Sequence, residues 1–363
     1  MASQKRKKFN IFFVILKTIS VFIAIALFVI PVCFGVVMYF NAPATGFNLQ
    51  GETDALRFAD DGSVLIDVRR GESSQSVGLR LERAGLINSR YFWNFLCRLN
   101  SEHIKTGTYR LEIPATPIAI HRVLVSGREV LHKVTIPEGV TLKKTALILE
   151  EAGITTAEGF LAAARDRSII NHYSIPNDSM EGYLFPDTYF FPGDFPPDRV
   201  VRTMADNFFN KLEIISPSFG GMSMRELNER VIMASIVERE YRVADEAPVM
   251  AGVFFNRLRI NMALQSCATV EYIITEILGR PHPRVLLFRD LEIRNPYNTY
   301  MYRGLPPGPI SAPGVVALRA AMYPENTRYL YFRLTDPASG RHYFSRTYDE
   351  HIRAGQLLTK PML

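Results

Sequence analysis

The chain of 363 residues is poor in cysteine and lacks the common metal and nucleotide motifs. Its three cysteines, Cys33, Cys97 and Cys267, match no metal-ligand spacing, and there is no His-Glu-x-x-His, P-loop or Gly-x-Gly-x-x-Gly pattern. We therefore expect neither a metal nor a cofactor. Because Cys33 lies in an apolar run, one disulfide at most, Cys97 to Cys267, is open, and nothing in the sequence supports it.

Acidic residues are also absent before Glu52, and the start of the chain is basic. The stretch Thr18 to Phe40 has 23 uncharged, mostly apolar residues, which is long enough to cross a bilayer. The positive-inside rule places residues 1–17 in the cytoplasm and the chain after about Asn41 outside. The basic residues that flank the stretch are Lys5, Arg6, Lys7, Lys8 and Lys17.

A cleaved signal peptide is the alternative to a membrane anchor at residues 18–40. The apolar core of a signal peptide is normally shorter, roughly 7–15 residues, and no convincing small-x-small cleavage site precedes Ala42. Cys33 does not follow a small residue, which argues against a lipoprotein site. We therefore predict an uncleaved transmembrane helix.

The formal net charge of +6 is concentrated at the N-terminus. The five flanking basic residues account for +5, which leaves +1 for the rest of the chain. A nearly neutral ectodomain has no electrostatic reason to bind nucleic acid, so we expect no nucleic-acid partner.

The ectodomain divides into a short tether and two domains. Residues 41–62 are polar and aperiodic and are predicted to form the tether. In residues 63–131 the pattern predicts a strand at Val64–Val68, two helices of which the second covers Arg90–Leu99, and a strand at Thr108–Ile113. This β-α-α-β order resembles a LysM-like module.

The remaining residues, 132–363, predict a larger mixed α/β domain. Helices dominate from Arg199 to Leu278, a Pro- and Gly-rich loop region follows Leu291, and two strands come near the end. The predicted fold class is α+β, with one transmembrane helix, a small LysM-like domain and this larger domain.

One carboxylate, Glu238, stands in an otherwise apolar helical stripe. The stripe recurs at spacings of four, three, four and three, so its members share one helix face. Burial disfavours the ionised form, so a carboxyl there can hold a proton near neutrality and serve as a general acid. The alternatives are that Glu238 pairs with an arginine or lies in water at the edge of the stripe. The other members are Leu227, Val231, Ala234 and Tyr241.

The segment Met180 to Tyr189 is rich in aromatic residues, Gly and Pro. Two interpretations stay open for its rings. They form either a wall on which sugars stack or a small aromatic core cluster.

Several segments, in this order, resemble the endolytic murein transglycosylase family, which is YceG-like. The resemblance covers the anchor, the LysM-like module and nearly all of residues 134–351. It rests on Ile136-Pro137-Glu138-Gly139, Glu181-Gly182 through Phe185-Pro186-Asp187-Thr188-Tyr189, Ala234-Ser235-Ile236-Val237-Glu238-Arg239-Glu240, Val253 to Leu258 with Leu264-Gln265, Pro296-Tyr297-Asn298-Thr299-Tyr300, Gly304-Leu305-Pro306-Pro307-Gly308-Pro309-Ile310, and Phe344-Ser345 to His351.

Two departures from the family pattern bear on rate and substrate preference. Cys267-Ala268 stand where the family usually has Asp-Pro, and Arg294-Asn295 stand where it tends to have Asp-Ser. The acid Glu238 is intact.

The resemblance implies a non-hydrolytic cut of the β-1,4 bond between N-acetylmuramic acid and N-acetylglucosamine within glycan strands, leaving a 1,6-anhydro end. Glu238 would protonate the leaving oxygen and then accept the proton of the muramoyl C6 hydroxyl. Glu240, roughly 200° round the helix, is expected to be solvent-facing or structural. The expected substrate-binding residues are Glu181, Tyr183, Gln265, Tyr297, Asn298, Thr299 and Tyr300. Of these, Gln265, Asn298 and Thr299 would make polar contacts with the sugar or hold Glu238, and the three tyrosines would supply stacking surface.

The resemblance also implies a place in the bacterial cytoplasmic membrane, with a single span and the catalytic domain outside. The expected partners are peptidoglycan glycan strands, the membrane through residues 18–40, and peptidoglycan synthases. The role would be to end the growth of nascent strands. Two alternatives remain: a lysozyme-like hydrolase with Glu181 or Glu240 as second acid, and a non-catalytic glycan-binding scaffold.

Overall fold

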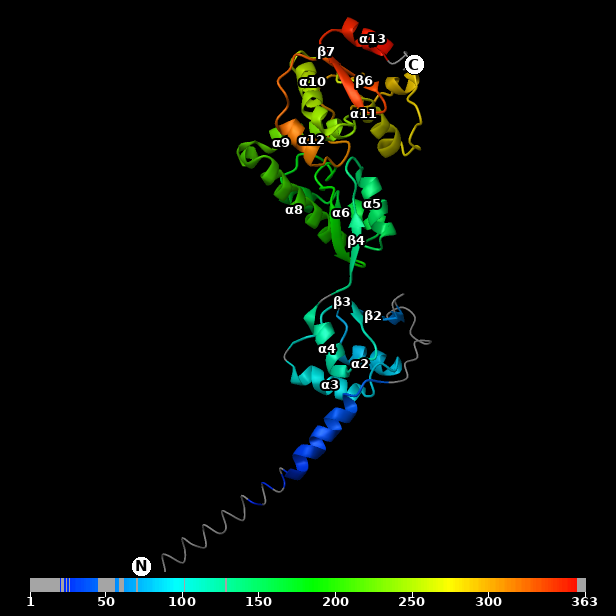
Figure 1. Cartoon of the computed structure of the whole chain (residues 1–363), viewed down its shortest axis with the longest axis vertical. Helices are drawn as coiled ribbons and strands as arrows, with labels where there is room; N and C mark the ends of the chain where they lie inside the picture. Colours follow the sequence, from blue (N-terminus) through cyan, green and yellow to red (C-terminus); the bar gives the residue numbers. More distant parts are fainter. Residues whose placement is uncertain are drawn as a thin grey trace, which may run out of the picture. The chain divides into compact units, whose positions relative to one another are not determined.

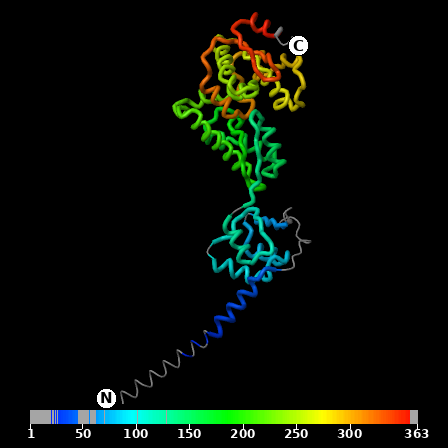
Figure 2. Tube along the Cα trace, viewed as in Figure 1, coloured from blue at the N-terminus to red at the C-terminus, as the bar shows by residue number. Residues whose placement is uncertain are grey.

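The chain folds into two compact units, residues Met1–Val130 and Leu131–Leu363, in a computed structural model (Figure 1). Figure 2 traces the same chain by residue number. The structure describes residues 20, 23, 25, 27–44, 56–58, 62–69, 71–100, 102–127 and 129–357.

The first unit is built on a three-stranded antiparallel sheet of order β1-β2-β3. The predicted order of strand, two helices and strand is confirmed by β2, α2, α3 and β3, and the serine or threonine before each helix caps it. Trp93 and Tyr109 lie fully buried in its core. The elements are β1 (Leu56–Phe58), β2 (Val64–Val68), α2 (Ser74–Arg83), α3 (Arg90–Leu99), β3 (Gly107–Leu111) and α4 (Pro117–Ser126).

The predicted tether at residues 41–62 is wrong in part. Leu56–Phe58 forms β1 and pairs with β2, because the sheet edge supplies partners for its backbone groups. Asn41 also belongs to the unit, since its side chain accepts a hydrogen bond from the Ile118 N–H. Most of the other tether residues lie outside the described part of the chain.

Residues 27–40 are helical, and their large apolar side chains other than Phe40 are exposed. Within the described residues, no helix combines the length and hydropathy needed to cross a membrane. The predicted tail at 1–17 and part of the predicted span at 18–40 lie outside those residues.

The second unit is mainly helical with two small antiparallel sheets, β4-β5 and β6-β7. Helices and small sheets together make a mixed fold, as the sequence predicts. The regular elements are β4 (Leu131–Thr135), α5 (Leu142–Glu151), α6 (Ala157–Ala163), α7 (Arg167–His172), β5 (Thr188–Pro192), α8 (Pro197–Ile215), α9 (Met224–Glu238), α10 (Ala247–Arg259), α11 (Cys267–Tyr272), α12 (Val315–Met322), β6 (Tyr331–Asp336), β7 (Arg341–Ser345) and α13 (Tyr348–Leu357), with a short π-helix at Ile273–Ile277 and a 3-10 turn at Phe288–Glu292.

Helix α9 runs through the core of this unit. Ser223 caps it by accepting a hydrogen bond from the Glu226 N–H, and α10 and α12 pack against it. Every residue from Val231 to Val237 is buried, so the helix is covered on all sides near its end and not along one stripe. That burial places the C-terminal residue, Glu238, where the core meets the surrounding loops.

Candidate active site

In the described part of the chain, two groups form hydrogen bonds with the Glu238 carboxylate, and neither is an arginine. Among the described residues, its Oε2 accepts a hydrogen bond of 2.8 Å from the Gly314 N–H, and its Oε1 lies 3.4 Å from the Tyr241 hydroxyl. Burial raises the pKa of Glu238 to about 7; the bond from Gly314 opposes that shift, and the charge of Glu138 adds to it. The carboxyl therefore exchanges its proton near neutral pH.

A second carboxylate, that of Glu138, lies beside Glu238. The loop that carries it is paired to another loop, with Gly139 donating to the Ala312 carbonyl and Ala312 to the Val140 carbonyl, both at 2.8 Å. A Cβ atom on Gly314 would collide with the Glu138 carboxylate. Only glycine at 314 therefore lets Glu138 approach the backbone group that holds Glu238.

An ion pair follows directly after Glu238. Arg239 Nη2 lies 2.8 Å from Glu271 Oε2, and His282 Nε2 lies 3.4 Å from the same oxygen. This cluster connects the end of α9 to α11 and to the segment after it.

Glu240 is not where helical geometry predicts. Because α9 ends at Glu238 and the chain then turns, an angle of about 200° round a helix does not describe Glu240. Its carboxylate accepts a hydrogen bond from the Ser266 hydroxyl, and burial raises its pKa to about 7. Glu240 therefore is not solvent-facing but ties the end of α9 to the start of α11.

Asn298 and Thr299 are buried and bound to the protein itself, so their expected contact with substrate is wrong. The Asn298 amide donates to two carbonyls of its own loop, and Asn298 Oδ1 accepts from the Tyr300 N–H. The Thr299 hydroxyl accepts from the Ser266 N–H and lies 2.9 Å from the Thr269 hydroxyl. Buried loops lack the regular backbone hydrogen bonds of helices and sheets, so side chains such as these bind their N–H and C=O groups.

Gln265 and Tyr300 border the same turn. Gln265 has an exposed side chain and a φ of 51°, and its N–H donates to the Thr299 carbonyl. The Tyr300 hydroxyl lies 3.1 Å from Cys267 Sγ. Cys97 and Cys267 are both free thiols.

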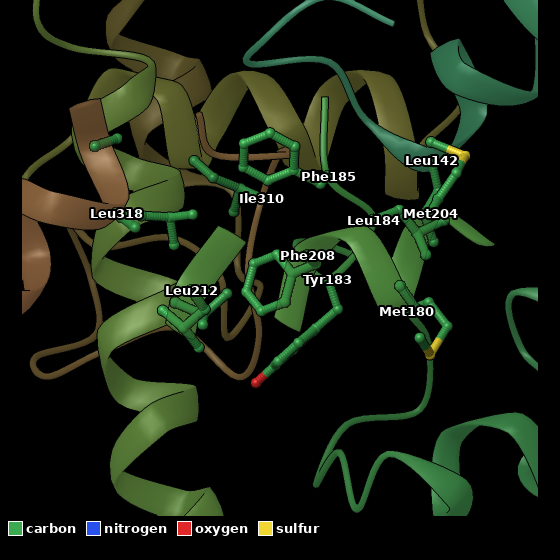
Figure 3. Packing of buried hydrophobic residues seen from close by; sticks show 14 of the residues in the cluster. Leu142, Met180, Tyr183, Leu184, Phe185, Met204, Phe208, Leu212, Ile310 and Leu318 are labelled. Carbon is green, nitrogen blue, oxygen red and sulfur yellow. The ribbon is translucent and has the colours of Figure 1, made fainter. Parts of the chain in front are cut away.

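Tyr183 belongs to the core, so the stacking role predicted for it is wrong. Its ring is fully buried beside Phe208 (Figure 3) and also packs against Phe209. Its hydroxyl donates to Asn228 Oδ1. Of the two interpretations of the Met180–Tyr189 segment, the aromatic core cluster is therefore correct for this ring.

Glu181 and Tyr297 line a separate pocket of about 190 Å³ beside Tyr272. Both Glu181 oxygens accept from the Leu142 N–H at the start of α5, at 3.1 and 3.2 Å. Burial raises the pKa of Glu181 to about 8. Leu142 follows the loop that carries Glu138, so Glu181 fixes that loop at its far end.

Sequence reasoning missed Glu138, Gly314 and the contact of the Tyr241 hydroxyl with Glu238. Glu138 was visible as the acid of the Ile136-Pro137-Glu138-Gly139 motif, but its distance along the chain from Glu238 gave no sign of their contact. Gly314 acts through its backbone N–H, which no residue pattern reveals.

Comparison with known proteins gives consistent matches. The sequence model of the YceG-like family matches residues 66–356. A protein named endolytic murein transglycosylase from Streptococcus pneumoniae serotype 2 is 29% identical over 344 residues, covering 85% of this chain and 61% of that protein. A protein of the same name from Bacillus subtilis is 29% identical over 309 residues, which cover 80% of this chain and 84% of that protein.

A crystal structure of a yceG-like protein from Listeria monocytogenes superposes with a TM-score of 0.54 at 31% identity, covering 80% of this chain and 98% of that one. The present chain thus spans 61% of the length of the pneumococcal relatives.

Proposed function

The chain belongs to the YceG-like family, and from that membership we propose that it is an endolytic murein transglycosylase. It would cut the β-1,4 bond between N-acetylmuramic acid and N-acetylglucosamine inside nascent glycan strands and leave a 1,6-anhydro-muramoyl end. The observation that carries the proposal is the half-buried carboxyl of Glu238, whose pKa is raised to about 7 and one oxygen of which is held by a backbone N–H.

One carboxyl is enough for this reaction because the nucleophile belongs to the substrate. Protonated Glu238 gives its proton to the glycosidic oxygen as the bond from C1 breaks. The muramoyl C6 hydroxyl then closes on C1 and gives its proton to the Glu238 carboxylate, which restores the acid without water. The Gly314 N–H holds Oε2 throughout, so proton transfer falls to Oε1, whose contact with the Tyr241 hydroxyl is long, at 3.4 Å.

The mass of the product tests the proposal against a lysozyme-like hydrolase. A hydrolase needs a second carboxylate to activate water. Glu181 and Glu240 are each bonded elsewhere, and the acid beside Glu238 is Glu138. We expect digests of isolated glycan strands to contain anhydro ends. Products one water heavier, with reducing muramic acid, would reject the transglycosylase and assign Glu138 to water activation.

The activity should fall as the pH rises through about 7. The reaction starts from the protonated form of Glu238, and the pKa of this group is raised to about 7, so the competent form is lost above that pH. The measurement is kcat/KM on glycan strands between mildly acidic and alkaline pH.

Glu138→Gln is the variant to compare with wild type in the dependence of kcat/KM on pH. It removes the negative charge that adds to the raised pKa of Glu238, so the alkaline limb should move to lower pH by about one unit or less. A limb that stays in place in Glu138→Gln, or activity that rises through neutral pH, would contradict the assignment of the acid.

The anchor and the location complete the proposal. Residues 18–40 would span the cytoplasmic membrane once, with residues 1–17 inside and the catalytic unit outside, near peptidoglycan synthases. The LysM-like module, supported by the β-α-α-β order of the first unit, would bind glycan.

An exported form without the anchor is expected to cut isolated glycan in solution but to shorten nascent strands poorly in cells. Because β1 pairs with β2 and the Asn41 side chain accepts a hydrogen bond from the Ile118 N–H, this form must begin no later than Asn41. The measurements are activity on purified strands and the strand length of newly made wall. Full replacement of the anchored protein at equal abundance would refute the location.

A further inference from the structure

Residues 277–289, which run from the end of the π-helix at Ile273–Ile277 into the 3-10 turn at Phe288–Glu292, present large apolar side chains to solvent. Phe288 is 89% exposed and Val285 is 72% exposed. Ile277, Leu278 and Leu287 are exposed as well. Soluble proteins seldom expose so many apolar side chains within one short segment, and such a patch marks a contact site.

The same segment is basic. It contains Arg280, Arg284 and Arg289, all exposed, together with His282, and no Asp or Glu. Asp290, the first acid after it, accepts a hydrogen bond from the Leu287 N–H. Positive charges interleaved with exposed apolar residues fit a partner that is both anionic and apolar.

The backbone of the segment is held at both ends. Leu278 and Arg280 donate to the carbonyls of Ile273 and Ile274, and Leu287 is bonded to the Asp290 carboxylate. Pro281 and Pro283 restrict the turn between them. Because the side chains are presented by an ordered segment, binding through them costs little further ordering.

The segment lies next to the candidate active site. His282 Nε2 is 3.4 Å from Glu271 Oε2, and Glu271 pairs with Arg239, the residue after Glu238. Whatever residues 277–289 bind is therefore held close to the acid.

We propose that residues 277–289 dock on the surface of a bilayer that contains anionic lipid. The arginines would meet lipid phosphates, and Phe288, Val285 and Leu287 would enter the boundary between headgroups and acyl chains. A glycan strand offers no apolar phase for the valine and leucine side chains. The proposal rests on the location outside the cytoplasmic membrane given above, and it would hold the acid where nascent strands emerge.

The test uses the full chain in vesicles whose acyl chains carry bromine, with Phe288→Trp as reporter. The native Trp93 is fully buried, so the wild-type signal supplies the background. We expect quenching and a blue shift of the new tryptophan in phosphatidylglycerol vesicles, and much less in phosphatidylcholine alone. The control is Phe190→Trp on β5, a residue 59% exposed outside the segment.

The triple variant Arg280→Gln, Arg284→Gln, Arg289→Gln in the Phe288→Trp background should lower the docking equilibrium by about fivefold per arginine, or about 10²-fold in total. Its cleavage of isolated strands in detergent solution should stay within about twofold of wild type, because none of the three replaced arginines contacts Glu238.

Equal quenching at positions 288 and 190, or no response to the charge of the lipid, would overturn the docking proposal. A raised KM for isolated strands in the triple variant would show that the segment binds glycan instead. If the wild type does not cleave isolated strands at all, the proposed function is refuted, whereas the docking of residues 277–289 is still decided by the quenching.

Discussion

Replacement of Glu238 by Gln is expected to give a folded protein that no longer cleaves glycan strands. The amide oxygen can still accept the hydrogen bond from Gly314, and the side chain has the same size, so the end of α9 should keep its structure. The amide cannot give or take the proton. Loss of a general acid or base costs about 10²–10⁴-fold in rate, and here one group serves both steps.

Glu240→Gln is the matched control for Glu238→Gln. Glu240 stands two residues away, and burial also raises its pKa to about 7, but its carboxyl is bonded to Ser266. A glutamine there keeps an acceptor for that hydroxyl, so the rate should fall by less than about tenfold. Circular dichroism and thermal unfolding check the fold of both variants. Near-normal activity of folded Glu238→Gln, or an equal loss in Glu240→Gln, would remove Glu238 from its role.

The comparison of wild type with Glu238→Gln also tests the alternative that the protein is a non-catalytic glycan-binding scaffold. If wild-type protein binds strands but never shortens them, the raised pKa of Glu238 has no catalytic use, and the buried carboxyl would be an uncompensated cost to stability. Binding of strands by Glu238→Gln with no cleavage, next to a wild type that cleaves, separates the two functions.

The sequence predicted what local patterns determine. The strand Val64–Val68 and the helix Arg90–Leu99 appear with the predicted bounds, because alternation and capping act over a few residues. The partial burial of Glu238 also followed from its apolar neighbours along α9. These features need no knowledge of how distant segments meet.

Asn298 and Thr299 differ from their predicted exposure for a different physical reason. A motif with Asn and Thr in an irregular loop predicts exposed polar groups, but Asn298 and Thr299 satisfy backbone groups of their own and neighbouring loops. The partnership of Glu138, Gly314 and Glu238 depends on three segments far apart in the chain. Neither the burial of a loop nor a contact through a backbone N–H can be derived from residue types.

Tyr183→Ala is expected to lower the free energy of unfolding of the second unit by about 3–5 kcal/mol, as for other large aromatic residues cut to alanine in a core. The ring is fully buried against Phe208 and Phe209, so its removal leaves a cavity between α8 and the loop before β5. Urea unfolding followed by circular dichroism measures the loss.

Tyr183→Phe separates the ring from its hydroxyl. It removes one hydrogen bond to Asn228 Oδ1, but that oxygen keeps its bond of 2.8 Å from the Asn177 amide. The cost should therefore be about 1 kcal/mol, and KM for glycan should not change. A ring that stacked on sugar would give the opposite pattern, with a raised KM and nearly unchanged stability in Tyr183→Ala. Tyr297 is half-buried and lines the pocket beside Glu181, so it serves as the comparison. We expect Tyr297→Ala to lower the free energy of unfolding less than Tyr183→Ala does. Equal losses of stability at the two positions would contradict the assignment of Tyr183 to the core.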